Sequence, residues 1–111
     1  ATFSVEGPFG AAAEVPDLSS HSTLEQNHPN PCNPQTTIRF NLERPGPATL
    51  RVYDTRGRMV RTLVGQDLSA GPHAIRWRGD NERGNTVPSG VYFYRLDTAE
   101  YSETKRMTLL K

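Results

Sequence analysis

Four side chains that carry oxygen atoms lie together in one short polar loop of the sequence. Carboxylate and amide oxygens are ligands that calcium prefers, and this loop offers them at Asp80, Asn81, Glu82 and Asn85. The spacing is shorter than that of an EF-hand loop, and the positive charge of Arg83 within the run opposes a bound cation. Short runs of Asp, Asn and Gly more often form turns, so we expect a turn first and a calcium site as the lesser alternative.

The residues that could act as a nucleophile or a base are isolated from one another. His21, His28 and His73 are far apart, and no G-x-S-x-G, H-E-x-x-H or phosphate-binding glycine motif occurs. The single cysteine, Cys32, has no cationic residue close by in the sequence and no second cysteine for a disulfide or a thiolate zinc site. We therefore expect no enzyme activity and no cofactor, with Cys32 as a buried and unreactive thiol.

Aromatic residues gather in the second half of the chain at Trp77, Tyr92, Phe93 and Tyr94. Several exposed rings side by side would form a platform on which sugars stack. In a strand, however, Phe93 faces the side opposite to Tyr92 and Tyr94, so Phe93 alone is expected to be exposed. One ring is not a platform, so the sequence favours core packing over glycan binding.

The charges of the chain are nearly balanced, with a formal net charge of +1. Six arginines between residues 38 and 64 stand against two acidic residues, Glu43 and Asp54. Arginines that alternate with Leu, Val and Ile are typical of the solvent-facing side of strands. Since no nucleic-acid-binding motif accompanies them, we expect no nucleic-acid partner.

Composition limits the elements that can position these residues. The chain has 111 residues, 34 % of them hydrophobic, with nine Gly and nine Pro scattered along it. Long helices are disfavoured because Pro removes a backbone donor and Gly weakens a helix interior. No apolar run approaches the roughly 20 residues of a membrane-spanning helix. One domain without a membrane span is expected.

From residue 36 onward, hydrophobic and polar residues alternate, as in half-buried strands. The alternation predicts an all-β fold, a small antiparallel sandwich of six or seven strands, with a closed barrel as the structural alternative. The expected strands are 36–42, 48–54, 58–64, 73–78, 91–97 and 103–110, with a tight turn at 54–57, a loop at 65–72 and a long polar loop at 79–90. The residues expected inside are Ile38, Phe40, Leu50, Val52, Ile75, Trp77, Tyr92, Tyr94, Leu96 and Met107.

The chain before residue 36 has a different composition. Residues 1–23 are rich in Gly, Ala, Ser and Pro, so we expect a linker or the tail of an upstream domain, with a strand at 2–6 as its one regular element. Because no charged-then-apolar leader is visible, the sequence is expected to be a mature fragment or an excised domain. Residues 24–35, here called the lead-in, contain three X-Pro steps, and proline keeps the preceding residue out of the helical region. The lead-in should therefore be extended and kinked.

Four blocks follow one another in the sequence: LEQNHPNPCNPQTTIRFNL, VYDTRGRMVRTLV, AGPHAIRWRGDNERGNTVPSGVYFYRL and TKRMTLLK. Over residues 24–111 they resemble the C-terminal sorting domain (type A) of type IX secretion cargo and the related Ig-like domain of flagellar hook-capping proteins. The resemblance implies that 24–111 form one Ig-like or fibronectin-like β-sandwich of about seven strands at the end of a larger secreted protein.

The function implied by this resemblance is that of a non-catalytic address label. Such a domain takes a covalently linked upstream cargo through the periplasm to the cell surface. Its implied partners are an outer-membrane translocon and a sortase, which commonly attaches the cargo to surface lipopolysaccharide. The alternative is a glycan-binding or structural Ig-like accessory module of a secreted enzyme. The sorting motif carried over from the family is Asn27, Pro29, Asn30, Pro31, Gly57, Gly90, Lys105, Met107, Leu109 and Lys111.

Two features of this motif lead to further expectations. The family usually has an aromatic residue at position 28 and Phe at position 32, where this chain has His28 and Cys32, and the smaller thiol should anchor the lead-in less firmly. In the last strand, Met107 and Leu109 should face inward, whereas the basic side chains Lys105, Arg106 and Lys111 should be exposed. A strand at the end of the chain should leave its backbone open, so that a partner could bind it by edge pairing and charge.

Overall fold

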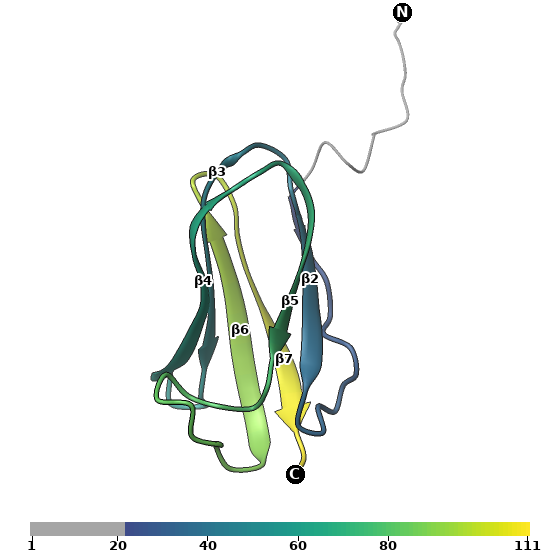
Figure 1. Cartoon of the computed structure of the whole chain (residues 1–111), viewed down its shortest axis with the longest axis vertical. Helices are drawn as coiled ribbons and strands as arrows, with labels where there is room; N and C mark the ends of the chain where they lie inside the picture. The colour runs from purple at the N-terminus through teal and green to yellow at the C-terminus, as the bar shows by residue number, and fades with distance from the viewer. Residues whose placement is uncertain (1–21) are drawn as a thin grey trace, which may run out of the picture.

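The computed structural model describes residues 22–111, and in this range the chain forms strands and no helix (Figure 1). Residues 1–21 of the expected linker, including the expected strand at 2–6, lie outside the described residues. The strands are β1 (Thr23–Leu24), β2 (Thr36–Leu42), β3 (Gly46–Tyr53), β4 (Met59–Leu68), β5 (Gly71–Trp77), β6 (Gly90–Thr98) and β7 (Ser102–Leu109).

The strands form two sheets that face each other (Figure 1). One sheet has the order β1-β2-β5 and the other the order β4-β3-β6-β7, with every neighbouring pair antiparallel. The predicted antiparallel sandwich is therefore confirmed, and the alternative of a closed barrel is wrong, because two separate sheets are present. No helix of residues 22–111 is long and apolar enough to cross a membrane.

The core lies between the two sheets and follows the predicted alternation. In β2 the inward residues Ile38 and Phe40 are buried, and in β6 Tyr92, Tyr94 and Leu96 are buried. Of the residues expected inside, only Ile75 is half-buried, because β5 is an edge strand of its sheet. The remaining residues expected inside are each at most 1 % exposed, as predicted: Trp77, Leu50, Val52 and Met107.

The predicted loop at 65–72 is wrong for most of its length. β4 continues to Leu68, and β5 begins at Gly71. A glycine and two polar residues at 65–67 are locally typical of a loop. The start of β3 nevertheless offers them a partner, with Gly65 opposite Thr49 and Leu68 opposite Gly46. Hydrogen bonding to β3 therefore extends β4 through residues whose composition is typical of a loop.

The tight turn between β3 and β4 is confirmed. Gly57 donates to the Asp54 carbonyl over 3.0 Å and has a φ of 80°, a conformation that favours glycine. The Asp54 side chain accepts the amides of Arg56 and Arg58 and pairs with the Arg58 guanidinium at 3.0 Å. These contacts, the Arg58 amide first, lower the pKa of the Asp54 carboxyl.

Candidate functional site

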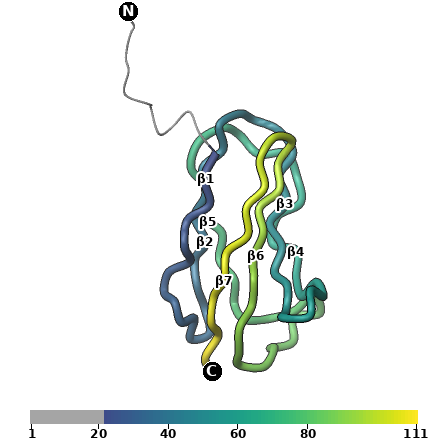
Figure 2. The backbone as a smooth tube through the Cα atoms, turned by 180° about the vertical axis from the view of Figure 1, so that it is seen from behind, coloured from purple at the N-terminus to yellow at the C-terminus, as the bar shows by residue number. Residues whose placement is uncertain are grey.

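The lead-in lies alongside the end of β7, although the two are at opposite ends of the described chain (Figure 2). Its three X-Pro peptide bonds are all cis, and it bends back to the sandwich at two points. His28 exchanges two backbone hydrogen bonds of 2.9 Å with Thr37 of β2. Cys32 forms a parallel bridge with Leu109 of β7. The lead-in thus connects the two sheets on one side of the molecule.

Residues of the lead-in occupy the edge of β7 that faces away from β6. Cys32 donates its amide to the Thr108 carbonyl at 2.7 Å, and its own carbonyl accepts the Leu110 amide at 2.8 Å. The Asn30 side chain accepts the Thr108 amide at 3.1 Å, and the Gln26 amide group donates to the Arg106 carbonyl at 2.8 Å. The expectation of an open terminal strand is therefore wrong for residues 106–110, because the lead-in already satisfies these backbone groups.

Asn27 is the buried polar centre of the lead-in, with 3 % of its surface exposed. Its Nδ2 donates to Thr36 Oγ1 at 2.9 Å and to the Pro29 carbonyl at 3.2 Å. Its backbone amide donates to Tyr94 Oη at 2.8 Å, and this hydroxyl in turn donates to the Glu25 carbonyl at 2.7 Å. An amide side chain fits this place because it supplies donors that a carboxylate lacks.

Burial raises the pKa of two groups at this place, the Tyr94 phenol beneath the lead-in and the Cys32 thiol within it. Desolvation raises the pKa of the Tyr94 phenol to about 12, although a hydrogen bond from Asn27 acts in the opposite direction. Desolvation also raises the pKa of the Cys32 thiol. Cys32 is 0 % exposed, which confirms the prediction of a buried thiol, and a protonated thiol is a poor nucleophile. Two backbone hydrogen bonds hold Cys32 on β7 whatever its side chain, and the looser anchoring expected of the smaller thiol stays a prediction.

Most of the carried-over motif meets at this place. Met107 and Leu109 are buried as predicted, and Gly90 lies opposite Leu109 on β6. Lys111 donates its backbone amide to Ser89 Oγ at 3.1 Å, beside the start of β6. The exceptions are Gly57 in the β3–β4 turn, which β3 and β6 separate from β7, and Lys105, which pairs with Glu103 within β7. The motif residues that the structure brings together are Asn27, Pro29, Asn30, Pro31, Gly90, Met107, Leu109 and Lys111.

The basic residues of β7 are not equivalent, contrary to the expectation of one exposed cationic end. Arg106 and Lys111 are exposed. Lys105 is two residues before Met107 in the strand, so both side chains lie on the same face of the sheet, and Lys105 is half-buried there. Its ammonium group pairs with the Glu103 carboxylate at 3.3 Å. Tyr101 Oη also donates to Glu103, and this bond and the Lys105 charge lower the pKa of the Glu103 carboxyl. The exposed positive charge at this end therefore comes from Arg106 and Lys111.

The polar loop that was considered for calcium forms a turn. Asn81 Oδ1 accepts the amides of Arg83 at 3.0 Å and Asn85 at 3.1 Å, and Asp80 Oδ2 pairs with Arg61 at 2.7 Å. Among residues 22–111, no three His, Cys, Asp or Glu side chains gather as a metal site would require. The turn is confirmed, and this geometry gives no support to a calcium site that includes Glu82.

Trp77, Tyr92 and Tyr94 are buried as predicted, whereas Phe93 points outward as predicted but is half-buried and not exposed. The structure adds a further outward ring, Tyr53, that the prediction did not include. Trp77, which donates Nε1 to the Asp80 carbonyl at 2.9 Å, packs edge-on against Tyr92 with 5.5 Å between ring centroids. Phe93 is half-buried on the outer face, the side of the four-stranded sheet that faces away from the core. Tyr53 lies directly opposite Phe93 on β3. The outward position of residue 53 follows from the alternation of 48–54, but its neighbour depends on the pairing of β3 with β6.

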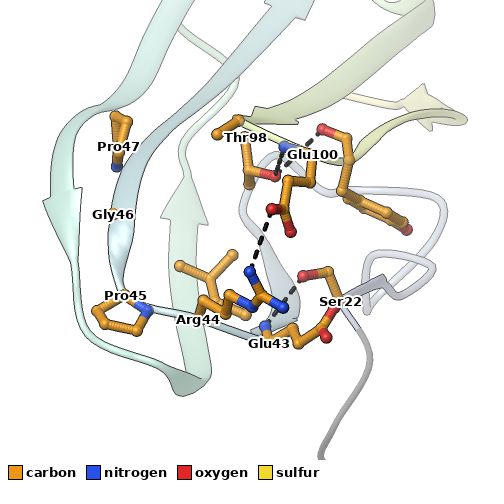
Figure 3. A pocket seen from close by; sticks show the side chains of 11 residues that line it. Ser22, Glu43, Arg44, Pro45, Gly46, Pro47, Thr98 and Glu100 are labelled. Carbon is orange, nitrogen blue, oxygen red and sulfur yellow. Dashed lines mark hydrogen bonds and ion pairs between the residues drawn. The ribbon is translucent and has the colours of Figure 1, made fainter.

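A pocket of about 420 Å³ opens at the end of the sandwich where β1 and β7 begin (Figure 3). Its polar groups bind one another, as Figure 3 shows: Arg44 pairs with Glu100 at 3.3 Å, and Ser22 Oγ accepts the Glu43 amide at 2.9 Å. Both members of the ion pair are well exposed, so the pair contributes little to stability. These groups offer no chemistry beyond this pairing.

Residues 33–101 match the family of the FlgD Ig-like domain. The basal-body rod modification protein FlgD of Salmonella typhimurium is 42 % identical over 60 residues, which are 51 % of this chain and 26 % of that protein. The FlgD of Escherichia coli strain K12 is 37 % identical with the same coverage. The chain thus spans about a quarter of the length of these relatives.

Three solved structures share the fold at lower identity. PorU from Porphyromonas gingivalis has a TM-score of 0.61 and 21 % identity, covering 80 % of this chain and 9 % of that one. PorZ from the same organism has a TM-score of 0.52 and 22 % identity, covering 78 % and 11 %. FlgD from P. aeruginosa has a TM-score of 0.53 and 24 % identity, covering 67 % and 58 %.

The family match leaves out the two segments that form the candidate site. Its range begins at residue 33 and ends at residue 101. Residues 24–32 of the lead-in precede it, and the whole of β7 follows it. These two segments are nevertheless the ones that bind each other through the hydrogen bonds of Cys32 and Asn30.

Proposed function

The chain belongs to the FlgD Ig-like domain family, and from this premise we propose that it is a non-catalytic module that directs a larger secreted protein through the type IX secretion system to the cell surface. One observation carries the proposal. Residues 24–32 of the lead-in and the whole of β7 lie outside the range that matches the family, and they join into one surface on the Ig-like sandwich. Two segments far apart in the sequence, each folded onto the other, provide the continuous surface that recognition of a folded domain requires.

The description of one fold neighbour supports this proposal. PorZ, whose structure is similar, is described as an essential bacterial surface component of the type IX secretion system. The partners we propose are an outer-membrane translocon and a sortase, with the cargo linked covalently upstream. The module would reach the surface through the periplasm.

The covered edge of β7 determines how such partners would bind. Edge pairing with residues 106–110 would require the lead-in to detach, because its groups already bind that edge. We therefore propose that the folded surface itself is recognised. Its exposed basic residues are Arg106 and Lys111, and its exposed backbone bends are at Pro29 and Pro31. Such recognition needs both ends of the domain to be folded, so the unfolded domain would not be bound.

A reporter fusion tests the proposal. The full chain is placed behind a periplasm-targeted reporter in a host with a type IX secretion system, and surface exposure is measured by protease accessibility on intact cells. We expect the parent to reach the surface and the double variant Arg106→Ser/Lys111→Ser to stay in the periplasm. The matched control is Arg76→Ser/Arg78→Ser, which removes the same charge from exposed positions in and after β5. A parent fusion that stays in the periplasm would overturn the sorting role.

A second candidate, a structural module of a flagellar-type assembly, is favoured by one observation. The sequence is 42 % identical over 60 residues to a basal-body rod modification protein, which exceeds its identity to the solved structures. In that case the Ig-like domain would pack within an assembly and carry no address. The reporter experiment separates the two candidates, since a purely structural module leaves the reporter in the periplasm.

A further inference from the structure

Two aromatic rings and two arginines lie in adjacent rows on the outer face of the four-stranded sheet. Tyr53 of β3 is opposite Phe93 of β6, and Arg51 is opposite Arg95 one outward position further along. All four alternate with buried residues, so their side chains leave the sheet on the solvent side. A hollow of about 360 Å³ lies here, lined by both rings, Arg95, Thr104 of β7 and the β3–β4 turn.

The positive charge of this face is only partly compensated. Like charges directly opposite each other on paired strands are destabilising. Arg95 donates to Asp97 Oδ1 at 2.9 Å and to Ser102 Oγ at 3.1 Å. Among residues 22–111, no side-chain hydrogen bond or ion pair is formed by Arg51, whose backbone is paired in the sheet. An anionic group bound between the two guanidinium groups would remove their repulsion.

The acidic residue that lines the hollow, Asp54, is already paired. The Asp54 carboxylate accepts two backbone amides and pairs with Arg58, so it does not neutralise Arg51. Exposed Arg106 lies opposite Phe93 on β7 and adds a further positive charge beside the rings. The hollow therefore combines a ring surface with excess positive charge on one side.

We propose that this face binds an acidic polysaccharide, with the rings of Tyr53 and Phe93 against sugar rings and Arg51 and Arg95 binding a carboxylate. An extended peptide fits less well, because β3 and β6 are central strands whose backbone groups are used in the sheet, whereas peptides add to open edges. A nucleic acid could also stack on the rings and pair with the arginines, and the test below separates it from a polysaccharide. The inference does not depend on the sorting role.

Affinity electrophoresis of the full chain tests this proposal. Native gels contain polygalacturonate, or dextran as a neutral glucan, and the retardation of the protein gives an apparent Kd. We expect retardation by polygalacturonate that weakens with added salt, and none by dextran. Arg51→Ala should weaken binding about tenfold, since hydrogen bonds to charged groups are worth about 1.5 kcal/mol or more. Phe93→Leu keeps an apolar side chain but removes the ring, and it should weaken binding to a similar extent.

The matched control for this test is an arginine on the opposite sheet. Arg76→Ala removes an exposed arginine from the opposite sheet and should leave the retardation unchanged. Thermal melts establish that each variant is folded before its affinity is compared. Equal retardation by polyglutamate or by an oligothymidylate would replace the proposal by a general affinity for polyanions or nucleic acid. No retardation of the parent, or full binding by folded Arg51→Ala and Phe93→Leu, would overturn it.

Discussion

The hydroxyl group of Tyr94 is the best single place to test how the lead-in is held. It accepts the Asn27 amide at 2.8 Å and donates to the Glu25 carbonyl at 2.7 Å. Tyr94→Phe removes both bonds and leaves the ring, which is fully buried, in place. The substitution therefore acts on the attachment of the lead-in and not on the packing of the core.

The expected loss follows from the burial of the two partners. Asn27 is 3 % exposed, so its backbone amide would be left without a partner inside the protein, at a cost of about 1–3 kcal/mol. Glu25 is exposed, so water can replace the hydroxyl at its carbonyl and the further cost is about 0.5–1 kcal/mol. We expect Tyr94→Phe to lower the free energy of unfolding by about 2–3 kcal/mol.

Urea denaturation combined with amide exchange measures this effect. Tyr92→Phe is the matched control, because its hydroxyl makes one bond of 2.7 Å to the carbonyl of exposed Pro88 and should contribute about 1 kcal/mol. In Tyr94→Phe, the amides of Thr108 and Leu110, which bind the lead-in, should exchange faster than in the parent. If Tyr94→Phe costs no more than Tyr92→Phe, and these two amides keep their protection, the reasoning is wrong.

Four further outcomes are expected. Trp77→Ala should cost about 3–5 kcal/mol because the largest core side chain is lost, and a melt within a few degrees of the parent would contradict its burial. Gly79→Ala should lower the free energy of unfolding by about 2–3 kcal/mol, and Gly84→Ala by about 1 kcal/mol. Both glycines have a positive φ, but the new Cβ at position 79 would also lie 3.2 Å from Leu109, whereas at position 84 it would meet nothing. Denaturation midpoints of the two variants measure the difference. Between pH 10 and 12 the Tyr94 phenol should lower stability by about 3 kcal/mol, because it loses its proton near pH 10 in the unfolded chain and near 12 in the folded one. The Tyr101 phenol, whose pKa is also raised to about 12, should lower stability over the same range, so pH-dependent melts of Tyr94→Phe should lack the Tyr94 part alone. The purified chain should hydrolyse no ester, peptide or glycoside substrate, and turnover abolished by a single substitution would refute this.

The strands and their faces could be predicted from the sequence, because burial in a sandwich imposes a period of two on each strand. The alternation of Ile38 and Phe40 with Arg39, and of Tyr92 and Tyr94 with Phe93, places each side chain on the correct face. The turn at Gly57 could also be predicted, because the four adjacent residues 54–57 end in a glycine, which favours a positive φ. The motif of the lead-in could also be identified, but not what its residues bind.

What lies beside each strand was decided by tertiary structure. Gln26 and Arg106 are 80 residues apart in the chain, and no local pattern indicates that the lead-in covers the edge of β7. The same is true of the strand pairing that sets Tyr53 beside Phe93 and extends β4 to Leu68. The period of two specifies which way a side chain points, but it carries no information about which strand satisfies the backbone at an edge. That choice depends on hydrogen bonds between distant segments, and in this protein those bonds build the candidate site.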